Sequence, residues 1–149
     1  MTHTSTAPDI LQSLRQIISD DQLITHPAQL ITYERDAGLD HGQPDGLAFP
    51  HTPEEVQRIV QWCHQQRIPL IARGAGTGLA GGAVAEHGGL ILELSRMKTI
   101  SELDETGRTV VVQAGTINAA LDALVREKGL YYPPDPSSGR AATLGGNIG

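Results

Sequence analysis

The sequence predicts an α+β fold, with a small βαβ unit followed by the start of a second α+β subdomain. Apolar runs at 47–50 and 68–72 are typical of buried strands, and an amphipathic helix pattern lies between them. A third apolar run at 90–94 predicts another strand. A hairpin pattern at 100–114 and a helix pattern at 117–128 follow.

The N-terminal region shows one helix pattern and one stretch without a period. Residues 9–19 place their apolar side chains on one helical stripe. Residues 23–45 have no clear periodicity and include the turn-rich sequence HGQPDG, so we expect mostly loop there. The stripe consists of Ile10, Leu11, Leu14, Ile17 and Ile18.

The helix of the βαβ unit has the best-marked start in the chain. Thr52 can cap it, Pro53 suits the first helical position, and Glu55 completes a capping box. An apolar stripe follows and includes Cys63. The later helix should end near Gly129, which stands where a C-terminal cap belongs.

Composition excludes several classes of function. The 149 residues carry a formal net charge of −6 and only 3% aromatic residues, which argues against nucleic-acid binding. One cysteine excludes an internal disulfide and a cysteine metal cluster. The sequence MTHTSTAPDI lacks the features of a signal peptide, and no apolar run approaches the roughly 20 residues of a membrane span. We expect a cytoplasmic protein without a transmembrane segment, and leave peripheral association with the inner membrane open.

The stretch IPLIARGAGTGLAGGA at residues 68–83 allows three interpretations. Residues 76–81 fit G-x-G-x-x-G, the fingerprint of a nicotinamide-type Rossmann site, but too few residues precede the next strand for the required crossover helix. The second interpretation is a surface loop that binds no ligand. The third is an anion cradle, in which glycines let backbone N–H groups approach phosphate oxygens. Arg73 and the Thr77 hydroxyl could add donors to such a cradle.

A second cluster, PPDPSSGRAATLGGN at residues 133–147, combines prolines with short polar side chains. Taken alone, it is typical of a rigid, capped turn. Together, RGAGTGLAGGA, PPDPSS and ATLGGN resemble the FAD-binding domain of the FAD-linked oxidases, the vanillyl-alcohol oxidase or PCMH-type family. The phrase FPHTPEEVQRIV resembles that family's opening strand and helix. The similarity extends over roughly residues 20–149, with residues 46–149 as the recognisable core, and is strongest to the branch that contains glycolate oxidase and D-lactate dehydrogenase.

The resemblance implies a PCMH-type fold of two α+β subdomains that enclose FAD, of which this chain would contain the βαβ subdomain and the start of the second. It also implies two segments that border this cofactor. The first would surround the pyrophosphate, and the second would lie along the flavin or its ribityl-diphosphate chain. The implied cofactor-binding residues are Arg73, Gly74, Ala75, Gly76, Thr77, Gly78, Leu79, Ala80, Pro134, Asp135, Ser138, Thr143, Gly145, Gly146 and Asn147.

Two departures from the family pattern limit what can be carried over. Thr77 stands where covalently flavinylated relatives have a histidine, so the resemblance implies non-covalent FAD. The chain ends within the glycine-rich motif, so we expect an N-terminal fragment that lacks the substrate domain, is inactive alone and has no catalytic residue to assign. The intact enzyme would oxidise a small 2-hydroxy acid, and other oxidase subunits are candidate partners. A non-catalytic nucleotide-binding module is the alternative.

A structural and a functional interpretation can be compared for Arg73, Asp135, the histidines and Cys63. Arg73 could hold a phosphate or bind strand carbonyls, and we favour the second role. Asp135 is expected to accept backbone N–H groups rather than to act as a base. The six histidines show no metal-ligand spacing, and Cys63 continues an apolar stripe, which predicts a core position and no metal site.

Overall fold

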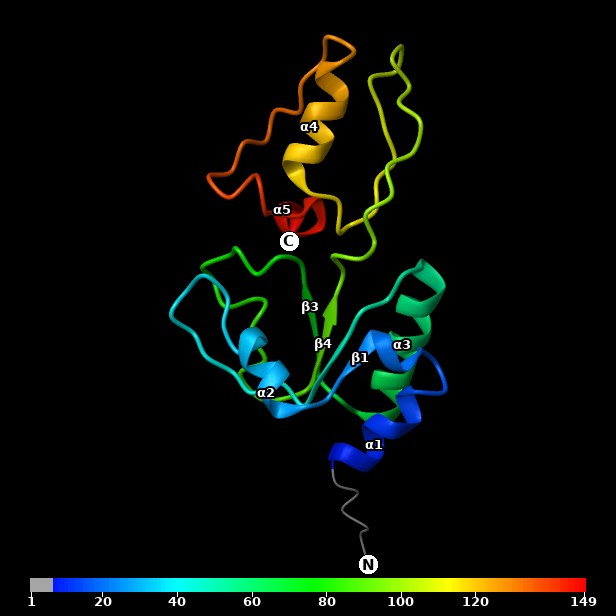
Figure 1. The fold of residues 1–149 in the computed structure, drawn as a ribbon, viewed down its shortest axis with the longest axis vertical. Helices are drawn as coiled ribbons and strands as arrows, with labels where there is room; N and C mark the ends of the chain where they lie inside the picture. Colours follow the sequence, from blue (N-terminus) through cyan, green and yellow to red (C-terminus); the bar gives the residue numbers. More distant parts are fainter. Residues whose placement is uncertain (1–6) are drawn as a thin grey trace, which may run out of the picture.

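The computed structural model describes residues 7–149, with side chains from Leu11 onward. The chain forms two lobes along one axis (Figure 1). We call residues 11–97, which contain the β-sheet, the sheet lobe, and residues 98–149 the hairpin lobe. The C-terminus lies between the lobes (Figure 1).

The sheet has four strands in the order β1-β2-β4-β3. Strands β2 and β3 both pair in parallel with β4, whereas β1 pairs antiparallel with β2 at the edge. Every residue of β4 is buried, as expected for a central strand. The strands are β1 (Leu23–Ile24), β2 (Gly46–Ala48), β3 (Leu70–Arg73) and β4 (Leu90–Glu93).

The predicted βαβ unit is present, but its two strands are not neighbours, because β4 lies between them. As the sequence indicated, residues 74–89 contain no helix. They connect two adjacent parallel strands, β3 and β4, without a crossover helix. Gly81, Gly88 and Gly89 have positive φ angles of 72°, 74° and 103°, which let the backbone turn back without a helix.

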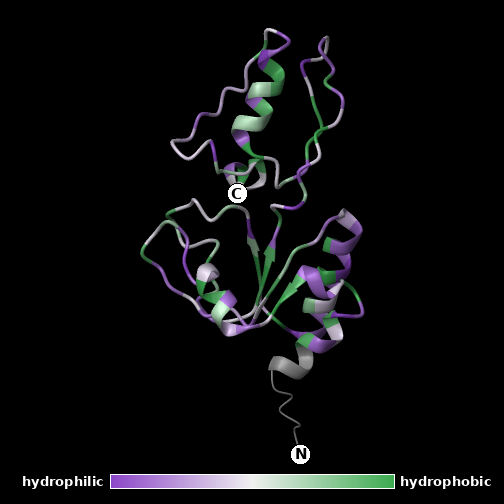
Figure 2. Cartoon of the chain, viewed as in Figure 1, coloured by the Kyte–Doolittle hydropathy of each residue, from purple (hydrophilic) through white to green (hydrophobic). Residues whose placement is uncertain are grey.

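Helices cover one face of the sheet. The core there joins α1 (Ala7–Leu14) and α3 (Pro53–Gln66) to β2 and β4. In Figure 2, α3 carries both polar and apolar bands, while β3 and β4 are apolar except at their last residues, Arg73 and Glu93. This core consists of Leu11, Leu14, Ile18, Ala48, Ile59, Trp62, Cys63, Leu90 and Leu92.

The opposite face of the sheet is covered by short elements that the sequence did not reveal. The stretch read as mostly loop contains β1, α2 (Pro27–Leu30) and a 3-10 turn, η2 (Ile31–Tyr33). Elements of two to four residues are too short to show a period. In the same way, the helix expected over 9–19 ends at Leu14, although Ile18 still reaches the core, and the side chain of Ile10 lies outside the described part.

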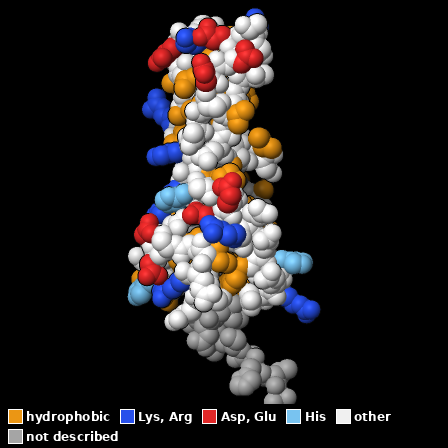
Figure 3. All heavy atoms as spheres, turned by 90° about the vertical axis from the view of Figure 1, so that its right-hand side faces the viewer, with side chains coloured by type: hydrophobic (Ala, Val, Ile, Leu, Met, Phe, Trp, Pro, Cys, Tyr) orange, Lys and Arg blue, Asp and Glu red, His pale blue; other side chains and the backbone are white. Residues whose placement is uncertain are grey.

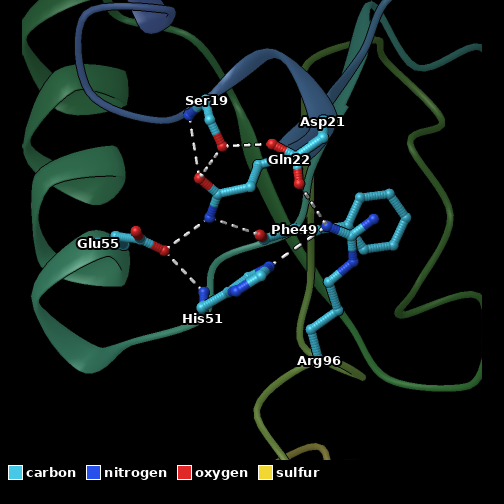
Figure 4. A network of polar contacts seen from close by, with 7 residues as sticks. All are labelled: Ser19, Asp21, Gln22, Phe49, His51, Glu55 and Arg96. Atoms are coloured by element: carbon cyan, nitrogen blue, oxygen red, sulfur yellow. Dashed lines mark hydrogen bonds and ion pairs between the residues drawn. The ribbon is translucent and has the colours of Figure 1, made fainter.

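The start of α3 forms the predicted Thr52 cap, but Glu55 does not close the expected capping box on the Thr52 N–H and contacts neighbouring residues instead. The Thr52 hydroxyl accepts the N–H of Glu55 at 3.2 Å. The Glu55 carboxylate in turn accepts the N–H of His51 and the side-chain amide of Gln22, both at 2.7 Å (Figure 4). Gln22 belongs to η1 (Asp20–Gln22) and also donates to the Phe49 carbonyl at 3.0 Å. The cap therefore ties α3 to β2 and to the N-terminal region.

The hairpin lobe contains the expected hairpin, but without regular strands. Two isolated antiparallel bridges, Ile100 with Val112 and Asp104 with Thr109, join its arms. Helix α4 (Asn118–Arg126) packs against the hairpin, and Gly129 follows it with a φ of 69°. The final α5 (Leu144–Ile148) was not predicted, because its LGGNI sequence is poor in helix formers. The face in Figure 3 mixes acidic and basic side chains along both lobes.

Candidate functional site

The two lobes enclose a cleft of about 800 Å³. Strand β3 runs into it, and the loop after this strand forms one wall. Residues 138–149 of the hairpin lobe form the other wall, and α5 lies over the ends of β3 and β4 (Figure 1). Ligands of α/β sheets bind at the carboxyl ends of parallel strands, which is where this cleft lies.

Most of the residues that the sequence associated with a cofactor line this cleft. Leu79, Pro134 and Asp135 do not. Other residues also line the cleft, among them Asp36 and Gly82, which were not among the expected cofactor contacts. Gly82 belongs to the glycine cluster, but nothing near Asp36 in the sequence indicated a site. The expected residues that line the cleft are Arg73, Gly74, Ala75, Gly76, Thr77, Gly78, Ala80, Ser138, Thr143, Gly145, Gly146 and Asn147.

The two walls touch at their glycines. A Cβ atom on Gly74 would overlap the hydroxyl of Thr143, and one on Gly145 would lie 2.8 Å from the Cβ of Ala114. The Gly145 N–H donates to the Ala114 carbonyl at 2.8 Å. At these positions glycine is therefore required by close packing within the protein.

Gly78 and Gly82 have no such structural reason. A Cβ atom on either would meet no protein atom within 4 Å, and neither has a φ in the left-handed region. Glycine costs backbone entropy on folding, so a glycine that packing does not require needs another explanation. Both line the cleft, where the missing side chain leaves room for a ligand.

The loop also presents unpaired backbone donors. Within the described residues, the amides of residues 75–80 donate no hydrogen bond to another protein group. Such a run of free N–H groups in a glycine-rich loop is the chemistry of an anion-binding nest. The cleft therefore suits the phosphate groups of a nucleotide cofactor.

Arg73 stabilises this loop through its side chain. Its guanidinium donates to the carbonyls of Ala83 at 3.0 Å and Arg35 at 2.9 Å, and lies 5.5 Å from the centre of the Tyr33 ring. The residue is 7% exposed, and burial lowers the pKa of the guanidinium. Arg73 thus binds loop carbonyls, although not those of its own strand as we had expected. A Cβ atom on Gly76, whose φ is 67°, would overlap the guanidinium.

The three expected residues outside the cleft have other surroundings. Leu79 is 73% exposed. The Pro134 carbonyl accepts the side-chain amide of Asn118 at 3.0 Å, which ties the proline-rich turn to α4. Asp135 is exposed, and within residues 7–149 its carboxylate accepts no backbone N–H, so its expected role in holding the loop is not seen.

Cys63, His41 and His51 have structural surroundings. Cys63 is buried in the core as predicted, and burial raises the pKa of its thiol to about 11, so it is no nucleophile at neutral pH. His41 pairs with Glu34 at 2.9 Å, and His51 contacts Arg96 at 3.3 Å. No group of three or more potential metal ligands occurs within residues 7–149.

Residues 44–149 match the family described as FAD binding domain. The chain belongs to this family of FAD-binding domains. The family resemblance read from the sequence is therefore confirmed. Free amides and open glycines in the cleft fit the diphosphate of this cofactor.

The relatives are similar over nearly the whole chain. Glycolate oxidase subunit GlcD of Bacillus subtilis is 38% identical over 141 residues, which cover 94% of this chain and 30% of that protein. D-2-hydroxyglutarate dehydrogenase of Xanthomonas citri is 40% identical over 144 residues, covering 96% of this chain and 30% of that protein. The chain thus spans less than a third of the length of these relatives.

Solved structures confirm the PCMH-type α+β fold that the sequence predicted. Alkyldihydroxyacetonephosphate synthase superposes with a TM-score of 0.83 at 24% identity, over 95% of this chain and 29% of that one. p-Cresol methylhydroxylase superposes with a TM-score of 0.77 at 23% identity, over 95% of this chain and 28% of that one. None of the helices in residues 7–149 is long and apolar enough to cross a membrane.

Proposed function

We propose that this chain is the FAD-holding part of an FAD-dependent oxidoreductase that oxidises a small 2-hydroxy acid such as glycolate or D-lactate. Membership of the FAD-binding domain family supports the cofactor. The names of the similar proteins, a glycolate oxidase subunit and a D-2-hydroxyglutarate dehydrogenase, support the substrate class. Association with other oxidase subunits, and the cytoplasmic location, stay predictions from the sequence.

The free amides of residues 75–80 carry this proposal. They would hold the diphosphate of FAD, while Gly78 and Gly82 let it approach the backbone. When bound, FAD supplies the hydride-accepting chemistry, and the protein contributes position and electrostatics. Leu79, Pro134 and Asp135 remain predicted contacts, which other conformations of the loops or further chain would have to bring to the cofactor.

Hydrogen exchange tests the cradle directly. In the complete protein that carries this sequence, the amides of residues 75–80 should exchange quickly without cofactor and slow down when FAD is added, because the diphosphate then accepts their hydrogen bonds. The amides of residues 139–147 should change little, since most already donate within the protein. Unchanged exchange at residues 75–80 with FAD bound would overturn the proposed cradle.

The substrate class needs a separate measurement. The purified complete protein should show a flavin spectrum that bleaches anaerobically on addition of glycolate, D-lactate or D-2-hydroxyglutarate. A bound flavin that none of these acids reduces would favour the non-catalytic nucleotide-binding module. Nicotinamide binding without flavin would instead support the Rossmann interpretation.

Non-covalent attachment forms part of the proposal. Thr77 lines the cleft, and its hydroxyl cannot replace an imidazole as the attachment point of flavin. Acid precipitation of the complete protein should therefore release all flavin into the supernatant. Yellow colour in the washed pellet would contradict non-covalent binding.

A further inference from the structure

Segment 33–42 wraps around the back of the glycine-rich loop, although it precedes this loop by some forty residues of sequence. Three hydrogen bonds join the two segments. The Ala37 N–H donates to the Gly78 carbonyl at 3.1 Å, and Arg73 donates to the Arg35 carbonyl. The Asp36 carboxylate accepts the Gly81 N–H at 3.0 Å. The shape of the loop thus depends on residues outside the glycine motif.

Asp36 occupies a position that electrostatics alone would disfavour. It lines the cleft proposed to hold a diphosphate, and two like charges in a cleft repel each other. Its two oxygens are, however, both engaged by backbone N–H groups. One accepts from Gly38 at 2.7 Å and the other from Gly81 at 3.0 Å. The positive charge of Arg73 acts on the same carboxylate and offsets part of the repulsion.

Gly81 is the residue at which the chain turns in this arrangement. Its φ of 72° turns the chain back after the free amides, and its own N–H is held by Asp36. The bond to Asp36 therefore fixes the end of the donor run, and the Ala37 bond to Gly78 fixes its middle.

We propose that Asp36 is a positioning residue for the cofactor: its carboxylate holds the turn at residues 78–81 so that the preceding amides face the diphosphate. This inference rests on the proposed FAD function. In this proposal Asp36 fixes the geometry of the anion site but makes no attractive contact with the anion.

The Asp36→Asn variant distinguishes a positioning role from electrostatic repulsion, because the two predict opposite changes in the FAD dissociation constant. Asparagine removes the negative charge but keeps only one accepting oxygen, so it cannot hold both N–H groups. If repulsion dominated, the variant would bind FAD more tightly. Positioning predicts the opposite, with an FAD dissociation constant raised about tenfold or more, as expected when a hydrogen bond to a charged group is lost.

Asp45 provides a matched control. Its carboxylate accepts the N–H of Gly89 at 2.7 Å, again across more than forty residues, and Gly89 also has a positive φ of 103°. This pair lies before β4, at the opposite end of the strands from the cleft. Asp45→Asn should therefore lower stability comparably but leave the FAD dissociation constant within about twofold of the parent.

The experiment uses the complete, FAD-loaded protein and its apoprotein. FAD affinity is measured by flavin fluorescence, ³¹P NMR of the bound diphosphate reports its surroundings, and hydrogen exchange of the apoprotein reports residues 75–80. In Asp36→Asn we expect weaker binding, a shifted ³¹P signal and altered exchange in that loop, with all three unchanged in Asp45→Asn. Asp36→Glu, which keeps the charge and moves the oxygens, should also weaken binding and serves if Asp36→Asn does not fold.

Tighter or unchanged FAD binding by a folded Asp36→Asn variant, or by Asp36→Glu where Asp36→Asn does not fold, would overturn the inference. Weaker binding with parent-like exchange in the apoprotein would also overturn it, because Asp36 would then contact the cofactor directly. A parent protein that binds no FAD would refute the proposed function itself, so the two failures are distinguishable.

Discussion

The two walls of the cleft have similar compositions and opposite hydrogen-bonding states. In the first wall the amides of residues 75–80 donate to no protein group within the described chain. In the second wall most amides of residues 139–147 are already engaged, for example Leu144 to the Thr116 carbonyl and Gly145 to the Ala114 carbonyl, both at 2.8 Å. The first wall has donors for a ligand, whereas the second uses its donors to join the hairpin lobe together.

This difference shows that glycine serves two purposes in one site. Gly74 and Gly145 allow protein segments to pack closely, while Gly78 and Gly82 leave space that no protein atom fills. A glycine-rich sequence alone does not separate these purposes. Substitutions should separate them, because adding a side chain harms folding in one case and cofactor binding in the other.

Gly76→Val should have the largest effect. The branched side chain opposes the φ of 67° at a cost of about 2 kcal/mol and overlaps the Arg73 guanidinium. We expect the complete protein to lose most of its flavin, with an FAD dissociation constant raised about a hundredfold or more. Flavin stoichiometry and thermal unfolding measure the two effects.

Gly129→Val is the matched control for that variant. Gly129 has a similar φ of 69° and open space around it, but it lies at the end of α4. The control should lose stability through the same backbone strain and keep its flavin. Equal flavin loss in both variants would mean that Gly76→Val acts only through general destabilisation.

Gly78→Ala and Gly145→Ala should show reciprocal effects of intermediate size. Alanine at 78 meets no protein atom, so stability should change by less than about 1 kcal/mol, while FAD affinity falls about tenfold. Alanine at 145 overlaps Ala114 and should cost about 1–3 kcal/mol of stability. Chemical denaturation and FAD titration measure both quantities. The same ranking of the two variants in both assays would remove the distinction between the walls.

Thr143→Val should have the smallest effect on cofactor binding. The Thr143 hydroxyl accepts the Gly146 N–H at 3.3 Å and caps α5, so its loss should cost about 1 kcal/mol of stability. We expect FAD affinity to change by no more than about threefold, and Thr143→Ser to behave as the parent. If Thr143→Val lost FAD as strongly as Gly78→Ala, the hydroxyl would be a direct cofactor contact.

Local signals in the sequence determined several elements correctly. Thr52, Pro53 and the apolar stripe placed α3, and Gly129 marked the end of α4, because caps and helix periods involve residues within a few positions of each other. The glycine-rich stretch suggested an anion cradle as one of three interpretations, since its backbone freedom is a local property, and this interpretation stays a prediction. Three motifs in order, RGAGTGLAGGA, PPDPSS and ATLGGN, were enough to indicate the family.

Tertiary structure decided the rest, because it depends on contacts between distant residues. The pairing of β4 with both β2 and β3 fixes the strand order, and no local period encodes which strands become neighbours. Asp36 lies at the cleft because contacts with distant residues, among them its bond to Gly81, hold segment 33–42 against the glycine-rich loop. The same holds for the amides: whether a glycine N–H is free for a ligand or bound within the protein depends on which carbonyl or carboxylate the fold brings beside it.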